Sequence, residues 1–451
     1  MNAPPRRAEQ LTLLQPELEL AQTELTSPKR ATERGSTSGK TYPYYAGFSE
    51  DFVRDVLAGA ALPDGARVLD PWNGSGTTVK AATEFGVIAD GFDLNPVMVI
   101  VARSRLSRTA DFCLASGFIS DVVGTCLDTP LVMCDGDPLD DWMGATAVSQ
   151  LRKIISETLQ AESDEYLNNT RAINQLVDVL PIWRCLVILA IFRSVKTLLG
   201  IRDGSNPTWT MLPEPDARRE LDVNHILAAV SGEIDNIRSI LTNGQSEDRD
   251  EVEMMPSVRC ASSEKMPLDD NTIDLVVTSP PYCTRIDYAK ATLVELAILG
   301  LSAKAVDSDL RRALIGTTSI KKSQPERNLT WGATCIDVLD YVYSHSSKGS
   351  RSYYYKNLLQ YFDSMFNSMR ELARVCKQGA SLNIVVQESF YKEKKIDLPL
   401  ILCEMGAGIG LSTQREIAFP VRLSMVNINT KSRRYREHSD VDEKVLILRR
   451  D

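Results

Sequence analysis

The chain has 451 residues, of which 51 are lysine or arginine and 60 are aspartate or glutamate, so its net charge at pH 7 is −9. Hydrophobic residues make up 43% of the sequence and charged residues 25%, as in ordinary globular proteins. This composition excludes a wholly disordered chain, a collagen-like chain and a small disulfide scaffold. The length alone predicts about three domains.

The cysteine and histidine content bears on metal and redox chemistry. The nine cysteines form no Cys-x-x-Cys pair and the three histidines lie far apart, so we expect no metal site. Scattered, odd-numbered cysteines suit a reducing cytoplasm, where we expect the protein to act. The longest dense apolar run, Cys185 to Phe192, is much shorter than the roughly 20 residues of a membrane span. It therefore predicts a buried helix and no membrane partner.

The first 40 residues are polar and rich in Pro, Ser, Thr and charge, which predicts a disordered tail. The tail ends in GSTSGKT at 35–41, which is similar to a phosphate-binding loop. That motif needs four residues between its glycines, and here there are three, so a flexible linker is the better interpretation.

Residues 41–106 alternate between helical and strand patterns. The predicted elements are a helix at 48–60, a strand at 66–70, a helix at 77–85, a strand at 87–93 and a helix at 97–106. Such alternation is typical of an α/β fold with a parallel sheet. We therefore predict that 41–106 forms the cofactor-binding half of a catalytic domain.

Residues 107–255 lack strand patterns and are predicted to form a mostly helical insertion. Amphipathic helices are expected at 151–159, 173–180 and 225–241, and the acidic run 247–253 is expected to be a solvated loop. The insertion, with its NPTW segment at 206–209, is a candidate for target recognition. A structural or partner-binding domain is a nearly equal alternative.

Residues 256–451 return to α/β patterning and are predicted to form the catalytic half. Strands are expected at 273–278, 381–387, 417–429 and 445–449, and helices at 289–314, 354–375 and 398–405. A polar loop is expected at 315–350.

The first chemical motif is DPWNGSGTT at 70–78, between a predicted strand and a predicted helix. Its glycines allow a tight turn and close approach to a ligand, and the helix start offers free N–H groups. Asp93 ends the next strand, where a carboxylate can hold two ribose hydroxyls. The context predicts a nucleoside-bearing cofactor.

The second motif is TSPPY at 278–282, directly after a predicted strand. Two prolines cannot continue a sheet ladder, so the chain leaves the sheet rigidly there. The motif presents the Ser279 hydroxyl, the Pro280 carbonyl and the Tyr282 ring at the sheet edge. A flat base can stack on the ring while its amine donates to the two oxygens; a plain tight turn is the alternative.

Together these motifs resemble those of the S-adenosylmethionine-dependent DNA amino-methyltransferases. The family's cofactor loop reads DPFxGSGTT, and its tetrad is Asn, Asp or Ser followed by Pro-Pro and an aromatic residue. TYPYYAGFS at 41–49 and RVCKQGASLNIVV at 374–386 are similar to two further family segments. The resemblance covers 41–106, 256–300 and 352–451, and implies a Rossmann-like class I methyltransferase sheet with helices on both faces. An acidic residue that often contacts the cofactor adenine is replaced here, at about Ser262.

The resemblance implies a set of site residues. S-adenosyl-L-methionine would be held by Tyr44, Asp70, Trp72, Asn73, Gly74, Gly76, Thr77, Thr78, Asp93 and Asn95. The catalytic tetrad would be Ser279, Pro280, Pro281 and Tyr282. Cys283 beside the tetrad is expected to be a bystander, because no basic partner is near it in sequence.

Serine in the first tetrad position is typical of cytosine N4 enzymes, so the resemblance favours cytosine N4 over adenine N6. An RNA guanine N2-methyltransferase and a catalytically silent nucleic-acid-binding subunit remain alternatives. The expected partner is double-stranded DNA with the target base flipped out, and cognate restriction or defence proteins are possible partners. Basic residues expected to contact DNA are Arg311, Arg312, Lys321, Lys322, Arg433, Arg434 and Arg436.

Overall fold

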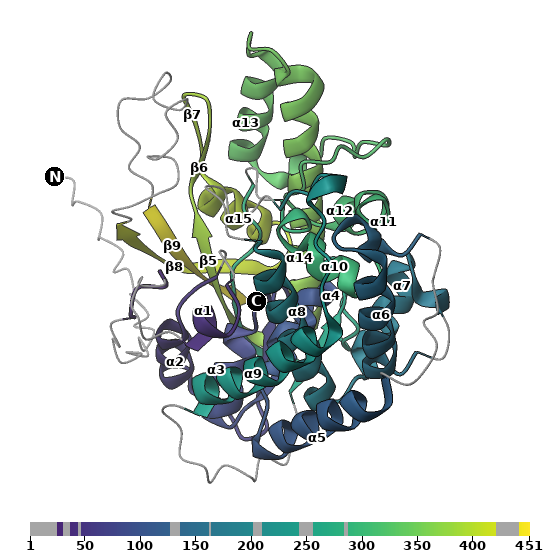
Figure 1. The fold of residues 1–451 in the computed structure, drawn as a ribbon. Helices are drawn as coiled ribbons and strands as arrows, with labels where there is room; N and C mark the ends of the chain where they lie inside the picture. The colour runs from purple at the N-terminus through teal and green to yellow at the C-terminus, as the bar shows by residue number, and fades with distance from the viewer. Residues whose placement is uncertain are drawn as a thin grey trace, which may run out of the picture.

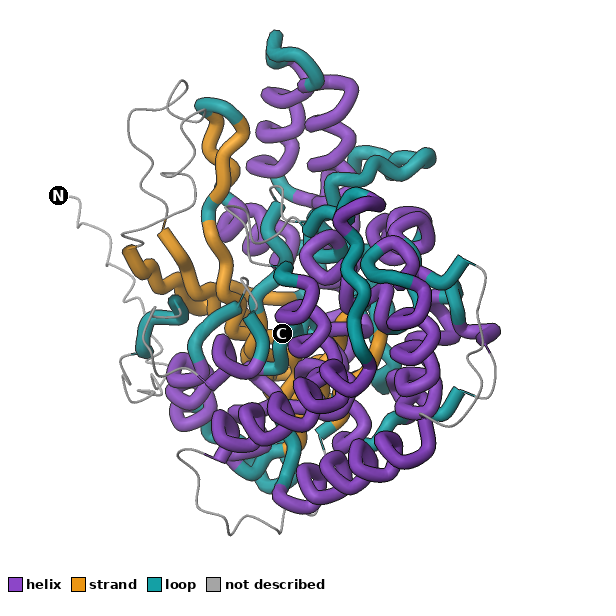
Figure 2. The backbone as a smooth tube through the Cα atoms, viewed as in Figure 1, coloured by secondary structure: helices purple, strands orange, loops and turns teal. Residues whose placement is uncertain are grey.

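A computed structural model describes residues 25–29, 37–43, 47–126, 136–161, 164–201, 210–242, 256–283, 287–420 and 442–451. Its centre is a seven-stranded sheet in the order β3-β2-β1-β4-β5-β9-β8 (Figures 1 and 2). The strands are β1 Arg67–Asp70, β2 Ile88–Asp93, β3 Ser257–Cys260, β4 Ile273–Thr278, β5 Cys376–Gln387, β8 Leu411–Pro420 and β9 Asp442–Arg450. The first five strands in the sheet order run parallel, and β9 is antiparallel to both of its neighbours.

The strand order reverses at β1, and this places the site. The chain passes from β1 to β2 and then β3 on one side, and returns as β4 on the other side of β1. Val68 of β1 lies opposite Ala89 of β2 and Leu275 of β4. Ligands of open α/β sheets bind beyond the carboxyl ends of the strands at such a reversal.

Helices cover both faces of the sheet, because its strands are apolar on both sides. Leu275 and Val277 of β4 pack into one core, whereas Ile273 and Val276 pack into the other. The first core receives α2 Glu50–Gly59, α3 Thr77–Phe85 and α4 Pro96–Ser104. The second receives α13 Ala333–Ser344, α14 Tyr355–Val375 and α15 Leu398–Ala407. The predicted Rossmann-like α/β fold with helices on both faces is confirmed.

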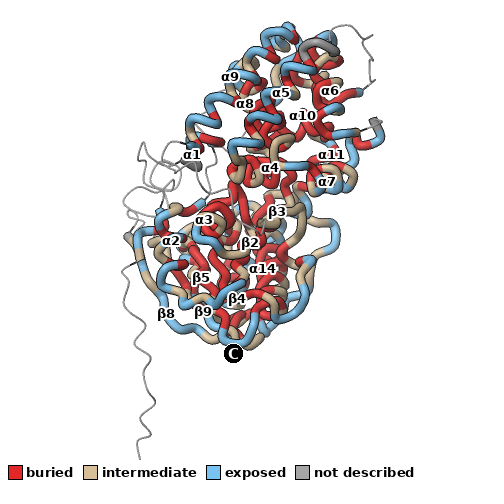
Figure 3. Tube along the Cα trace, turned by 90° about the horizontal axis from the view of Figure 1, so that it is seen from below, coloured by how far each residue is buried: buried red, intermediate tan, exposed pale blue. Residues whose placement is uncertain are grey.

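The described part of the 107–255 segment is mostly helical. Its helices are α5 Thr109–Cys126, α6 Ala145–Leu159, α7 Thr170–Val179, α8 Ile182–Leu199 and α9 Val223–Thr242. They gather on the far side of α4, whose residues are almost all buried between the sheet and this layer (Figure 3). The apolar run Cys185 to Phe192 is buried inside α8 as predicted.

Part of the predicted N-terminal tail is folded, so that prediction is wrong for the described residues. Pro28 O accepts a hydrogen bond from Ser49 N (2.8 Å), and Thr26 N donates to the carboxylate of Asp55 (2.7 Å). Residues 37–41 form the short helix α1 Thr37–Thr41. Ser49 and Asp55 of the α2 region supply the partners of the first segment, whereas Arg193 of α8 donates to Lys40 O of α1 (2.8 Å).

Residues 315–350 are not loop throughout, since α13 occupies 333–344. The short strand β3 and the hairpin of β6 Ser389–Tyr391 with β7 Lys394–Ile396 were not predicted. The strand expected at 417–429 overlaps β8 at 417–420, and its residues 421–429 lie outside the described residues. The helical stretch 289–314 is divided into α10 Leu293–Ile298, α11 Ala303–Ser308 and α12 Leu310–Ala313. Among the described helices, none has the length and apolarity needed to cross a membrane.

Candidate active site

A cavity of about 920 Å³, counted out to its open mouth, lies beyond the carboxyl ends of β1, β2 and β4. The two sequence motifs, 208 residues apart at their first positions, meet in its walls. The first motif contributes Trp72, Asn73, Gly74 and Thr77, and the end of β2 and the start of α4 contribute Asp93 and Asn95. The second motif contributes Ser279, Pro280, Pro281 and Tyr282.

The glycine loop packs closely against α4. Gly74 and Gly76 have φ angles of 48° and 79°, in the region that favours glycine. A Cβ on Gly76 would lie 2.7 Å from Cβ of Ala102 in α4. Gly76 therefore lets the loop lie against α4 and does not itself line the cavity.

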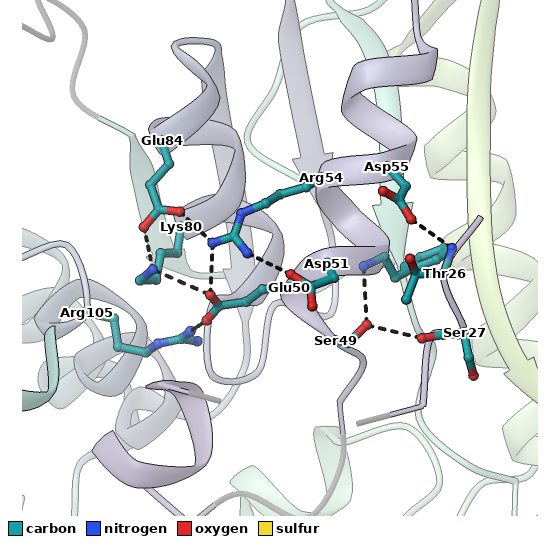
Figure 4. A network of polar contacts seen from close by, with 11 residues as sticks. Thr26, Ser27, Ser49, Glu50, Asp51, Arg54, Asp55, Lys80, Glu84 and Arg105 are labelled. Atoms are coloured by element: carbon teal, nitrogen blue, oxygen red, sulfur yellow. Dashed lines mark hydrogen bonds and ion pairs between the residues drawn. The ribbon is translucent and has the colours of Figure 1, made fainter. Parts of the chain in front are cut away.

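A cluster of ion pairs supports this loop from outside (Figure 4). The Arg105 guanidinium, whose side chain is fully buried, donates to Ser75 O in the loop (2.5 Å) and pairs with Glu50 of α2. Glu50 also lies 3.3 Å from Arg54 and 3.5 Å from Lys80 of α3. The cluster ties α2, α3 and the loop together.

The side-chain amide of Asn73 is buried against Gly91 of β2. Asn73 is 4% exposed, and its backbone N–H donates to Phe92 O (2.9 Å). Neither Oδ1 nor Nδ2 has a hydrogen-bond partner among the described residues, and the same is true of Trp72 Nε1. Buried polar groups are rarely left unpaired, so this wall fits a polar cofactor above the loop.

Asp93 lines the same part of the cavity and holds the backbone at Gly74 and Asn95. Its two carboxylate oxygens accept hydrogen bonds from Gly74 N (3.0 Å) and Asn95 N (2.8 Å). Burial raises the pKa of Asp93 to about 6, although these backbone bonds oppose the shift. Each oxygen keeps a lone pair, so the carboxylate can accept hydroxyl groups from the cavity.

Asp70 lies beneath the cavity and joins its two motifs. Its Oδ1 accepts hydrogen bonds from the Thr278 hydroxyl (2.6 Å) and from Trp72 N (3.2 Å). Thr78 donates across the same junction to Val277 O (2.9 Å). Burial raises the pKa of Asp70 to about 6. Asp70 and Thr78 were predicted to bind cofactor, but neither lines the cavity.

The tetrad follows β4 with two oxygens available to a substrate. Ser279 lines the cavity, and none of the described residues hydrogen-bonds its hydroxyl or donates to the Pro280 carbonyl. The next carbonyl, Pro281 O, accepts from the buried Tyr361 hydroxyl of α14 (2.9 Å). Tyr282 N donates to the Tyr288 hydroxyl (3.2 Å). The rigid turn is thus held from both sides.

Tyr288 and Tyr361 are functional candidates that sequence reasoning missed. Tyr288 lines the cavity, and burial raises the pKa of both phenols well above the usual range, so both stay protonated. Nothing local in sequence marks either residue, because the contacts depend on how α14 and the loop after the tetrad return to the site. Burial also raises the pKa of the Cys283 thiol to about 11, which keeps it neutral and fits a bystander.

The predicted DNA-contacting residues differ in surroundings. Arg311 donates to Asp287 (2.6 Å) and Asp307 (3.0 Å), so its charge is used inside the protein. Arg312 and Lys322 are exposed and Lys321 is half-buried. Tyr44, the NPTW segment, Arg433, Arg434 and Arg436 lie outside the described residues. Within the described ranges no three His, Cys, Asp or Glu side chains gather as a metal site would require.

No family model matches the chain. It is similar to the type II methyltransferase M.BsoBI of Geobacillus stearothermophilus, with 23% identity over 81% of this chain and 77% of that protein. It is 22% identical to the type II methyltransferase M.AvaI of Anabaena variabilis, over 84% and 80% of the two chains. It is 21% identical to the type II methyltransferase M.MvaI of Kocuria varians, over 79% and 77%. All three of these relatives are type II methyltransferases.

Proposed function

We propose that this protein transfers a methyl group from S-adenosyl-L-methionine to the exocyclic amine of a DNA base, with cytosine N4 favoured. The observation that carries the proposal is the meeting of the glycine loop, Asp93 and the Ser-Pro-Pro-Tyr turn in one cavity. The type II methyltransferases to which the chain is similar support the same reaction class and a restriction-modification setting.

The loop side of the cavity would hold the cofactor. Asp93 would accept hydrogen bonds from its ribose hydroxyls, and the unpartnered amide of Asn73 would bind its polar groups. The Trp72 ring, which lines the same wall, would cover its flat or apolar part. When bound, S-adenosyl-L-methionine supplies an electrophilic methyl group.

The tetrad side would prepare the amine. The lone pair of an aryl amine is delocalised into its ring, which makes it a poor nucleophile. Hydrogen bonds from its N–H groups to the Ser279 hydroxyl and the Pro280 carbonyl would localise that lone pair on nitrogen. The remaining effect would be proximity and orientation of the amine, and both oxygens would lie near the positive charge that develops on its nitrogen.

The base must leave the duplex to reach this cavity. Tyr282 would stack on the extruded base, and its backbone is held by the Tyr288 hydroxyl. Serine in the first tetrad position favours cytosine N4 through the family resemblance. Methylation of adenine N6 would follow the same mechanism, and only the methylated product distinguishes the two alternatives.

The test is mass spectrometry of deoxynucleosides from cells that express the protein or its Ser279→Ala variant. We expect N4-methylcytosine with the wild-type chain. In the variant its amount should fall by at least about 100-fold, because the cavity can still orient the base but no longer accepts a hydrogen bond from its amine at this position. The variant should still bind S-adenosylhomocysteine in calorimetry. Ser120→Ala, an exposed serine of α5, is the matched control and should methylate normally.

N6-methyladenine in place of N4-methylcytosine would keep the mechanism and overturn the base. Equal methylation by wild type and Ser279→Ala would overturn the role of the tetrad.

A further inference from the structure

A helical projection stands at the top of Figure 1. It consists of α13, a π-helical turn Ser350–Tyr354 and the first turns of α14. We call residues 343–356, with the sequence YSHSSKGSRSYYYK, the tip.

The tip is basic and aromatic. It contains three cations, Lys348, Arg351 and Lys356, and no acidic residue. All three cations are exposed, and none forms an ion pair with another described residue. The Arg351 guanidinium lies 4.1 Å from the ring centroid of Tyr343, which is itself 41% exposed. Basic residues interleaved with aromatic ones fit the charge and chemistry of nucleic acid.

The hairpin of β6 and β7 holds the tip in one shape. The buried Ser350 hydroxyl bonds Ser347 (3.0 Å) and the Tyr391 hydroxyl of β6. The His345 ring contacts Ser347 through Nδ1 (3.0 Å) and Glu393 of the hairpin through Nε2 (3.1 Å). A surface fixed in this way loses little conformational entropy when it binds.

One face of the π-helical turn and of α14, which follows it, connects the tip to the tetrad. The Tyr353 hydroxyl donates to Thr318 O (3.1 Å), Asn357 Nδ2 donates to Thr317 O (2.6 Å), and the Tyr361 hydroxyl donates to Pro281 O (2.9 Å). At 1.5 Å per residue, the start of α14 lies about 9 Å along the helix from Tyr361. The exposed Lys322 lies in the loop that this face supports, beside Lys321, whose N–H donates to Gln360.

The helical insertion has the opposite charge. Residues 107–255 contain 12 basic and 24 acidic residues, a net charge of −12. A polyanion is repelled by such a surface, which argues against the insertion as the duplex-facing part.

We propose that the tip is the surface on which duplex DNA docks, with Lys348, Arg351 and Lys356 on its phosphates. This inference rests on the proposed function and assigns it a DNA-binding surface. A duplex seated on the tip would present a neighbouring base to the tetrad along α14.

The experiment compares binding of a fluorescein-labelled 40-base-pair duplex of mixed sequence by three full-length proteins across a salt series. They are the wild type, Lys348→Ala/Arg351→Ala/Lys356→Ala, and a control with the same charge change, Arg171→Ala/Arg238→Ala/Lys304→Ala. The control residues are exposed on α7, α9 and α11 and form no ion pair with described residues. Binding of S-adenosylhomocysteine shows that each protein is folded.

We expect the tip variant to lose about tenfold or more in duplex affinity, and the slope of log K against log salt to fall by up to about 2.7, at 0.9 for each lost phosphate contact. The control should keep the wild-type slope. Equal losses in the two variants, or a wild-type slope in the tip variant, would overturn the inference while leaving the Ser279→Ala test untouched. A wild type that forms no methylated base would instead count against the proposed function.

Discussion

Two aspartates end neighbouring strands of the sheet, and their partners give them different roles. Asp70 ends β1 and accepts hydrogen bonds from Thr278 and Trp72, where the two motifs meet. Asp93 ends β2 and accepts only backbone N–H groups while facing the cavity. Asp70 is therefore a positioning residue, whereas Asp93 is the acceptor that a bound ribose would meet.

The raised pKa of Asp93 makes cofactor affinity depend on pH. Its carboxyl has a pKa of about 6 in the folded protein, so it takes up a proton as pH falls through 6 and loses acceptor strength. In calorimetry with S-adenosylhomocysteine we expect constant affinity near pH 8 and a decline below about pH 6. Asp93→Asn should bind about tenfold more weakly or worse at pH 8, as for a lost hydrogen bond to a charged group, and lack the decline.

An affinity of the wild type that stays level down to pH 5 would remove the ribose role of Asp93.

The raised pKa of Asp93 also affects the stability of the ligand-free protein. Because the folded pKa lies above the ordinary value of 3.8, the contribution of Asp93 to stability is complete below pH 3.8 and is lost as pH rises through about 6.

At the residue level, motif spacing predicted which side chains share a cavity but not how each is used. Trp72, Asn73, Asp93 and the tetrad line one cavity, because strand ends of a parallel sheet meet at one edge; their roles there stay predictions. Arg311 was predicted from its charge alone, and sequence gives no sign that Asp287 neutralises it.

At the level of elements, prediction worked where local pattern and tertiary contacts agree. The helix at 77–85 was predicted with its observed bounds, since glycines stand just outside both ends. The strand β3 has only four residues, one of them buried, and so carries no alternation to detect. In α13 the buried Cys335, Val338, Leu339 and Val342 have helical spacing, but polar loops on both sides obscured it.

The ion-pair cluster around Glu50 predicts that α2 and α3 depend on one carboxylate. Glu50→Gln removes the acid from beside the fully buried Arg105 side chain. Breaking a buried pair in this way costs about 3 kcal/mol, measured as the free energy of unfolding in urea. Asp51→Asn removes a mostly exposed acid that also pairs with Arg54 and should cost less than about 1 kcal/mol. A cost for Glu50→Gln as small as that of Asp51→Asn, below about 1 kcal/mol, would show that the buried pair of Glu50 and Arg105 adds little stability.

For the whole molecule, the total charge conceals a difference in net charge between the insertion and the rest of the chain. The chain is acidic overall at −9, but the insertion alone carries −12, so the remainder is slightly basic. The candidate active site and the tip both belong to that remainder, whereas the insertion covers α4. Composition could not reveal this, because the average does not say which charges share a surface.

The packing of α4 between sheet and insertion predicts that the two parts unfold together. Ile188 lies fully buried in α8, which packs on α4. Ile188→Ala removes buried methyl groups and should cost about 3 kcal/mol. Hydrogen exchange of peptides from α8 and from β4 should then accelerate by the same factor, because both are protected by one global unfolding step. Leu114→Ala, at a half-exposed position of α5, should change neither by more than about 0.5 kcal/mol. Acceleration confined to α8 would mean that the insertion unfolds alone and that α4 is stable without it.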